Sequence, residues 1–97
     1  MRPSQFLPAA RAELLEAQSY YDEVWPGLGA DFVAEVERVL QLLRQRPALG
    51  APGSAHTRRF SLRRFPYSVV YLVESEKLTV VALAHHRRRP DYWRRRL

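Results

Sequence analysis

The spacing of apolar side chains changes once along this chain, near residue 57, and that change limits the folds open to it. Before it, apolar residues recur every three or four positions, as on one face of a helix, and after it they alternate, as in a strand. Helices followed by strands indicate the α+β class, with the helices packed on one face of an antiparallel sheet. The length of 97 residues suits a single domain spanning 1–97.

Two helices are expected in the first half of the chain. The first begins near Ala9 and ends after Val24, where Pro and Gly follow within three residues. The second runs from about Ala30 to Gln45 and is closed by Pro47. Because only a few residues link them, the helices should form an antiparallel hairpin. Their apolar stripes are Ala10, Leu14, Ala17, Tyr21 and Val24 on the first helix, and Phe32, Val36, Val39, Leu40 and Leu43 on the second.

Three strands are expected after a loop at residues 48–56, namely Thr57–Leu62, Tyr67–Val73 and Leu78–Ala84. The last two are apolar on both faces, which indicates central positions in a sheet. A further short strand at Gln5–Leu7 would lie at an edge, because prolines on both sides of it lack a backbone N–H. We therefore expect a sheet of three to four antiparallel strands that carries the helical hairpin on one face.

The last residues, 85–97, form a basic tail that is expected to contain one helical turn around Asp91–Arg95. Trp93 should pack on the body of the protein, because an exposed indole among six arginines would leave a large apolar area in water. Three aromatic residues at the end of the first helix are expected to be core or interface anchors; they are Tyr20, Tyr21 and Trp25.

Charge is divided unequally along the chain, whose formal net charge is +6. Residues 1–56 hold five arginines against seven carboxylates, whereas residues 57–97 hold ten arginines and Lys77 against three carboxylates. The second part, at +8, should attract an acidic partner such as nucleic acid, a ribosome or an acidic protein segment. The excess of arginine over lysine is also typical of a GC-rich genome, so composition alone does not choose between these explanations.

Several classes of protein are disfavoured by what the sequence omits. It has no cysteine, which excludes disulfides, a thiolate nucleophile and cysteine-ligated zinc, and fits the reducing cytoplasm in which we expect the protein. No apolar run approaches the roughly 20 residues of a membrane span. Residues 1–8 lack the apolar region of a secretory signal. No motif indicates a cofactor, and the neighbouring His85 and His86 would diverge on a strand, so we expect no metal site.

Four segments, taken in order, resemble the RelE/ParE superfamily of toxins of type II toxin–antitoxin systems. They are Ala9–Ala17 with Tyr20-Tyr21, Pro26–Gly29 leading to Phe32, Arg58–Phe60 followed by Arg64–Tyr71, and Ala84–Trp93. Together they span nearly the whole chain. The resemblance is nearer to the ParE-type branch, whose members are often labelled plasmid stabilization proteins.

The ParE branch implies a toxin that inhibits DNA gyrase by binding the gyrase–DNA complex, without chemistry of its own. In that interpretation the basic part of the chain contacts the target. The target-binding candidates are Arg59, Arg63, Arg64, Arg87, Arg88, Arg89, Tyr92, Trp93, Arg94 and Arg95, with Arg96 beside them. A solvated basic tail without a target is the simpler alternative.

The RelE branch implies instead a ribosome-dependent mRNA endoribonuclease, so the sequence leaves open whether the protein is an enzyme. That reaction needs an activated 2′-hydroxyl, a neutralised phosphate and a protonated leaving oxygen. Arginine can hold the phosphate but stays protonated, which leaves the two histidines as the acid–base groups near neutral pH. The catalytic candidates in this case are His85, His86, Tyr92 and Arg64. A third possibility is a degenerate toxin that serves only as a regulatory binding module.

The resemblance also implies a cognate antitoxin of the ParD type and a hetero-oligomer of the two proteins. The acidic C-terminal segment of the antitoxin would be disordered alone and would fold along the toxin, on the groove between the helices, a sheet edge and the basic second half of the chain. Such a segment would neutralise part of the +8 charge, which predicts an association that weakens with salt.

Overall fold

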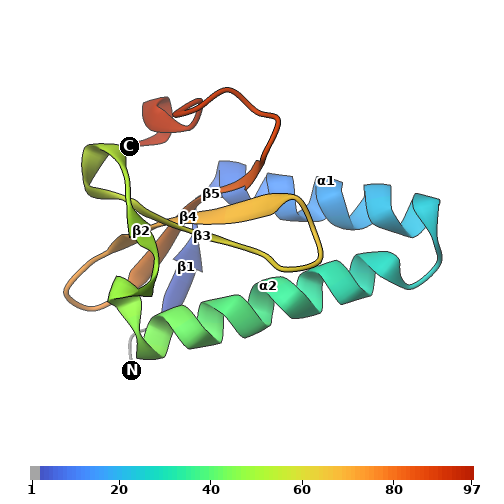
Figure 1. The fold of residues 1–97 in the computed structure, drawn as a ribbon, viewed down its shortest axis with the longest axis horizontal. Helices are drawn as coiled ribbons and strands as arrows, with labels where there is room; N and C mark the ends of the chain where they lie inside the picture. Colours follow the sequence, from blue (N-terminus) through green and yellow to red (C-terminus); the bar gives the residue numbers. More distant parts are fainter. Residues whose placement is uncertain (1–2) are drawn as a thin grey trace.

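Two helices, α1 (Pro8–Val24) and α2 (Leu28–Gln45), form the expected hairpin on one face of a sheet in the computed structural model, which describes residues 3–97 (Figure 1). The first two residues, part of the stretch considered for a secretory signal, lie outside that range. Pro8 stands in the first turn of α1, where its missing N–H costs nothing. No helix within residues 3–97 is long and apolar enough to cross a membrane.

A tight turn joins the helices and holds their ends together. Gly27 adopts a left-handed conformation with φ of 91° at the start of α2. Gly29 is buried, and its N–H donates to Oδ1 of Asp22 at 2.8 Å. A side chain at position 29 would meet the carbonyl oxygen of Gln18 at 2.3 Å, so only glycine allows the helices to approach this closely.

The sheet has five strands in the order β1-β5-β4-β3-β2. The predicted strands are found as β3 (Arg58–Ser61), β4 (Tyr67–Val73) and β5 (Leu78–His85), and β4 and β5 occupy central positions. At the edges lie β1 (Ser4–Phe6), parallel to β5, and β2 (Ala51–Pro52), antiparallel to β3. The sheet is therefore mixed rather than purely antiparallel. No hairpin turn joins β1 to β5, so nothing local fixed their relative direction, and β2 is too short to show an alternating pattern.

A bulge in β5 changes which side chains face the helices. Val70 pairs with Ala82 and Tyr71 pairs with Val80, which leaves Val81 as an extra residue on β5. Leu78, Val80 and Leu83 belong to the core under the helices, whereas Val81 and Ala82 both belong to a second cluster on the opposite side. A strict alternation along β5 would have assigned Ala82 and every residue after it to the wrong face.

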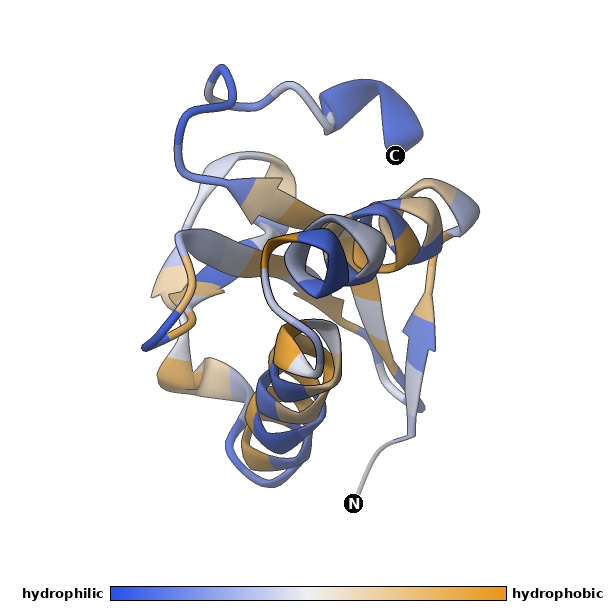
Figure 2. Ribbon diagram, turned by 90° about the vertical axis from the view of Figure 1, so that its right-hand side faces the viewer, coloured by the Kyte–Doolittle hydropathy of each residue, from blue (hydrophilic) through white to orange (hydrophobic). Residues whose placement is uncertain are grey.

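The face of the sheet away from the helices, here called the outer face, is partly covered by residues 86–97, here called the tail (Figures 1 and 2). The anchor is Trp93, which is 5% exposed and packs on Val70, Val81, Ala82 and Ala84, as expected. The helical turn of the tail is a short 3-10 helix, η3 (Arg94–Arg96), slightly later than predicted. The main core lies on the other face and includes Tyr21, which packs on Phe32, Phe65 and Tyr67.

Candidate functional site

The second half of β5 has no neighbouring strand on the side of β1, and side chains form hydrogen bonds with its backbone there instead. The ladder between β1 and β5 reaches only Val80, whose carbonyl accepts the N–H of Leu7. Beyond it, the N–H of Leu83 donates to Oε1 of Glu13 at 3.0 Å. The carbonyl of Val81 accepts from Nη1 of Arg96 at 3.0 Å. Two backbone groups that could otherwise pair with a foreign strand are thereby occupied.

Glu13 on α1 is the centre of this arrangement and clamps the tail to the body. Its carboxylate accepts two hydrogen bonds from Arg96, at 2.9 and 2.8 Å, and one from the Tyr92 hydroxyl at 2.6 Å. Burial raises the pKa of Glu13, but the hydrogen bonds from Arg96, Tyr92 and the Leu83 N–H outweigh it and leave the pKa below its ordinary value. Burial, and then the Glu13 carboxylate, raise the pKa of Tyr92, so this hydroxyl is held in its neutral form.

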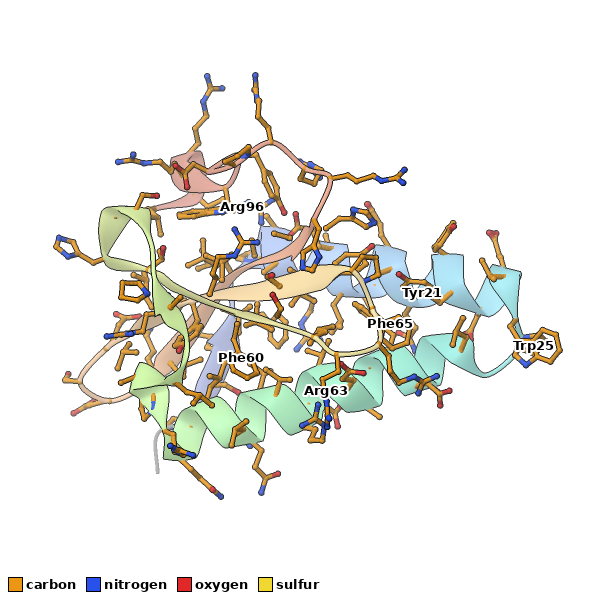
Figure 3. The ribbon with its side chains drawn as sticks, viewed as in Figure 1. Tyr21, Trp25, Phe60, Arg63, Phe65 and Arg96 are labelled. Carbon is orange, nitrogen blue, oxygen red and sulfur yellow. The ribbon has the colours of Figure 1, made fainter. Side chains whose placement is uncertain are left out.

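The tail is fixed at further points while most of its arginines stay in water. Ser54 donates to Oδ1 of Asp91 at 2.8 Å, and Asp91 adopts a left-handed φ of 61°. The guanidinium of Arg88 lies 3.8 Å from the centre of the Tyr92 ring, a cation–π contact. Figure 3 shows Arg96 reaching from the tail toward the sheet. The exposed arginines of the tail are Arg87, Arg88, Arg89, Arg94 and Arg95.

A row of polar side chains crosses the outer face from β3 to the end of β5. Ser68 of β4 is fully buried and stands at its centre. Its hydroxyl accepts from Nη2 of Arg59 at 3.1 Å, and lies 3.1 Å from Oγ of Ser61 and 3.0 Å from Nε2 of His86. Arg59 and His86 are themselves exposed, so the network presents a guanidinium and an imidazole to solvent. Both groups bind phosphate or carboxylate oxygens well.

Arg63 and Arg64 lie elsewhere, in the turn between β3 and β4 beside α2, and Arg63 is labelled there in Figure 3. The buried Glu35 of α2 holds this turn by accepting the backbone N–H groups of Arg63, at 2.5 Å, and Arg64, at 3.2 Å. The Arg64 guanidinium lies 3.6 Å from the Asp31 carboxylate, and both are well exposed. A shallow hollow of about 620 Å³ lies between the turn and α2. The ten target-binding candidates thus occupy two surfaces, and Trp93 among them is buried.

The two histidines face opposite sides of the sheet, as expected for neighbours on a strand. His85 faces the helices, with its ring centre 5.0 Å from that of Tyr67, and its Nδ1 accepts the N–H of Arg87 at 3.0 Å. His86 belongs to the outer face. Tyr92 is engaged by Glu13 at the sheet edge, and Arg64 lies beside α2. The four candidates for nuclease chemistry therefore have four different surroundings.

Two residues that organise this region were not identified from the sequence. Glu13 looked like an ordinary solvated residue of an amphipathic helix, although it lies one turn from the buried Ala10 and Ala17, which was the available signal. Ser68 interrupts an otherwise apolar strand and is its only small polar residue. A polar residue at a buried strand position requires hydrogen-bond partners, so Ser68 was the sequence signal from which a polar network could have been expected.

One comparison with known proteins shows the family, and another shows the fold. The family model described as "ParE toxin of type II toxin-antitoxin system, parDE" matches residues 5–90. A solved structure titled "Chromosomal ParDE TA system from P. aeruginosa" superimposes with a TM-score of 0.77, covering 88% of this chain and 96% of that chain. At 19% sequence identity, this second likeness shows a shared fold. A search of curated proteins finds no match.

Proposed function

The chain belongs to the ParE toxin family of type II toxin–antitoxin systems, and from that premise we propose that it inhibits DNA gyrase by binding the gyrase–DNA complex. The observation that carries the proposal is the family match over residues 5–90, which spans the helices, the sheet and the start of the tail. The proposal places the protein in the cytoplasm, where gyrase and chromosomal DNA lie.

The electrostatics of the outer face support a role in binding the DNA of that complex. Arg59 and His86 are exposed beside a tail that carries five exposed arginines. The tail is held in place by Trp93 and the Glu13 clamp, so its arginines are presented from a fixed backbone. Contacts from such residues to phosphates are insensitive to DNA sequence and weaken steeply with salt.

The positions of the acid–base groups support binding without a chemical step. A nuclease needs a base and an acid on either side of one phosphate. The Tyr92 hydroxyl donates to Glu13 and has a raised pKa, which disfavours a role as a base. His85 and His86 lie on opposite sides of the sheet, so they do not flank a common substrate position.

The proposal includes neutralisation by a cognate antitoxin of the ParD type, in a hetero-oligomer. An acidic C-terminal segment of that antitoxin would lie along the basic outer face and compete there with phosphates. The +8 charge of residues 57–97 supports this complementarity. In this arrangement one surface serves both the target and its inhibitor, so binding of the antitoxin excludes binding of DNA.

The test is a gyrase assay with purified, antitoxin-free protein, scoring supercoiling and stabilised cleavage of plasmid DNA. We expect inhibition with accumulation of cleaved DNA, and we expect His86→Ala to retain most of it. Absence of any effect at micromolar protein would reject the gyrase proposal. In that case cleavage of ribosome-bound mRNA, abolished by His86→Ala, would establish the nuclease alternative.

A further inference from the structure

The end of α1 and the turn that follows it carry three exposed large apolar side chains, here called the hairpin tip: Tyr20, Val24 and Trp25, the last of which is labelled in Figure 3. Their exposed fractions are 60%, 57% and 71%. Tyr20 and Val24 lie one helical turn apart on α1, and Trp25 follows directly. Tyr20, Tyr21 and Trp25 were expected to be core or interface anchors, and of the three only Tyr21 packs in the core. Val24 was expected on the apolar stripe of the helix, but it lies at the end of α1 and is exposed.

The tip is rigidly built although its side chains are in water. The N–H of Trp25 donates to the carbonyl of Tyr21, the last turn of α1. Asp22 is tied to the first turn of α2 through the N–H of Gly29. The backbone under Val24 and Trp25 is therefore fixed by both helices. A large indole held outward on a rigid backbone loses little entropy on binding a partner, which is a property of interface anchors.

Acidic side chains accompany the tip along the end of α1. No Lys or Arg stands between Arg11 and Arg38 in the sequence, and Glu16, Asp22 and Glu23 lie in the last turns of α1. Other carboxylates of that stretch have partners inside the chain, such as Glu13 with Arg96 and Asp31 with Arg64. Glu16, one turn before Tyr20, and Glu23, next to Val24, are exposed, and neither forms an ion pair within residues 3–97. The tip therefore repels both nucleic acid and an acidic antitoxin segment.

A hollow of about 230 Å³ adjoins the tip along α1. Tyr20 belongs to both surfaces, and Glu16, Tyr67 and His85 line the hollow with it, together with Arg88 of the tail. The hollow can receive one side chain of moderate size between α1 and the end of β5. Apolar anchors, unpaired carboxylates and a recess together have the composition of a protein-binding surface.

We infer that the hairpin tip docks a protein segment of the toxin's target that presents lysine or arginine around an apolar side chain. The inference rests on the proposed function, because it assigns the tip to the protein part of the complex and leaves the DNA to the outer face. Trp25 and Tyr20 pack on the apolar side chain of the partner. Glu16 and Glu23 pair with its basic residues.

The first test measures binding of purified gyrase, without DNA, to immobilised antitoxin-free protein. Trp25→Ala and Glu23→Lys should each weaken binding on the order of tenfold or more, as for interface anchors. Leu15→Ala is the matched control, since Leu15 is 52% exposed on α1 but outside the tip, and Glu76→Lys controls for added charge. Retention of gyrase binding by both tip variants would overturn the inference while leaving the proposed function intact.

A second test does not depend on gyrase. The indole N–H signals of the two tryptophans are followed by NMR, assigned with Trp25→Phe, while an amphipathic peptide of alternating leucine and lysine is added. The Trp25 signal should move and the Trp93 signal should not, and the same peptide with glutamate in place of lysine should have little effect. An unmoved Trp25, or equal shifts with both peptides, would overturn the inference. A dimer abolished by Trp25→Ala would assign the tip to a second copy of the chain and also overturn it.

Discussion

The two tryptophans of this toxin lie in opposite settings: one is buried and stabilises the fold, and the other is exposed and available to a partner. Trp93 lies in the most basic segment of the chain yet is buried, while five of the six arginines of the tail are exposed. Trp25 lies in the most acidic segment and is exposed. In the tail a buried aromatic residue fixes the position of charged side chains, whereas at the hairpin tip the aromatic residue is itself mostly exposed and lies near carboxylates. Figure 1 shows the two regions at different ends of the molecule.

The comparison implies that changes in the tail alter folding and binding together, whereas changes at the tip alter binding alone. The tail depends on a buried indole and on the Glu13 clamp, both of which contribute to stability. The tip exposes its side chains and depends on backbone hydrogen bonds that a side-chain substitution leaves in place.

The largest expected effect is that of Trp93→Ala. Removing a buried indole should lower the free energy of unfolding by about 3–5 kcal/mol, because it leaves a cavity over Val70 and Ala82. Trp25→Ala, the matched control, should change it by no more than about 0.5 kcal/mol. Urea denaturation followed by circular dichroism measures both. Similar losses in the two variants would contradict the distinction between the regions.

The clamp should contribute less than the indole. Glu13→Gln removes the negative charge that accepts hydrogen bonds from Arg96 and Tyr92. We expect the free energy of unfolding to fall by about 1.5–3 kcal/mol, as for hydrogen bonds to charged groups. Glu16→Gln, on the next turn of the same helix but exposed, serves as the control and should be nearly neutral. Faster amide exchange across residues 92–96 in Glu13→Gln would locate the loss in the tail, and unchanged exchange there would argue against a clamp.

The stabilisation that the Glu13 carboxylate provides should depend on pH. The pKa of Glu13 is lowered in the folded protein from its ordinary value of 4.5. The stabilisation is therefore complete above pH 4.5 and is lost as the pH falls through the lower, folded-state pKa. The difference in stability between wild type and Glu13→Gln should shrink in that acidic range. A difference that does not shrink at any acidic pH at which the protein still folds would show that charge is not its source.

The smallest of these effects concerns the outer face and should leave stability unchanged. Arg59→Ala removes one exposed guanidinium, so the slope of log affinity for duplex DNA against log salt should fall by roughly 0.9. Arg46→Ala, an exposed arginine at the end of α2, is the control and should not alter the slope. Equal slopes for the wild type and Arg59→Ala would remove Arg59 from the DNA-binding surface.

The sequence predicted the helices and the long strands because each depends on a local pattern. The apolar stripe of α2 and the runs Tyr67–Val73 and Leu78–His85 are long enough to fix their type. The two-residue β2 and the parallel pairing of β1 depend on neighbours distant in sequence. The bulge at Val81 is equally non-local, since it appears only when β5 is paired with β4.

The candidate site was predictable in composition but not in arrangement. The arginines were visible as a run, and the burial of Trp93 followed from its surroundings. The clamp joins Glu13 to Arg96 across 83 residues, and no local signal links them. The exposure of Tyr20 and Trp25 was equally hidden, because an aromatic residue at the end of an amphipathic helix suits a core and an interface alike.

The most direct test of two separate surfaces is the inhibition of gyrase supercoiling by four proteins: wild type, Arg59→Ala, Trp25→Ala and the double variant. We expect each single variant to raise the half-inhibitory concentration, and the two factors to multiply in the double variant, as they do for distant, independent sites. A double variant no weaker than the poorer single variant would place both residues on one surface. Undiminished inhibition by both single variants would contradict the two-surface model altogether.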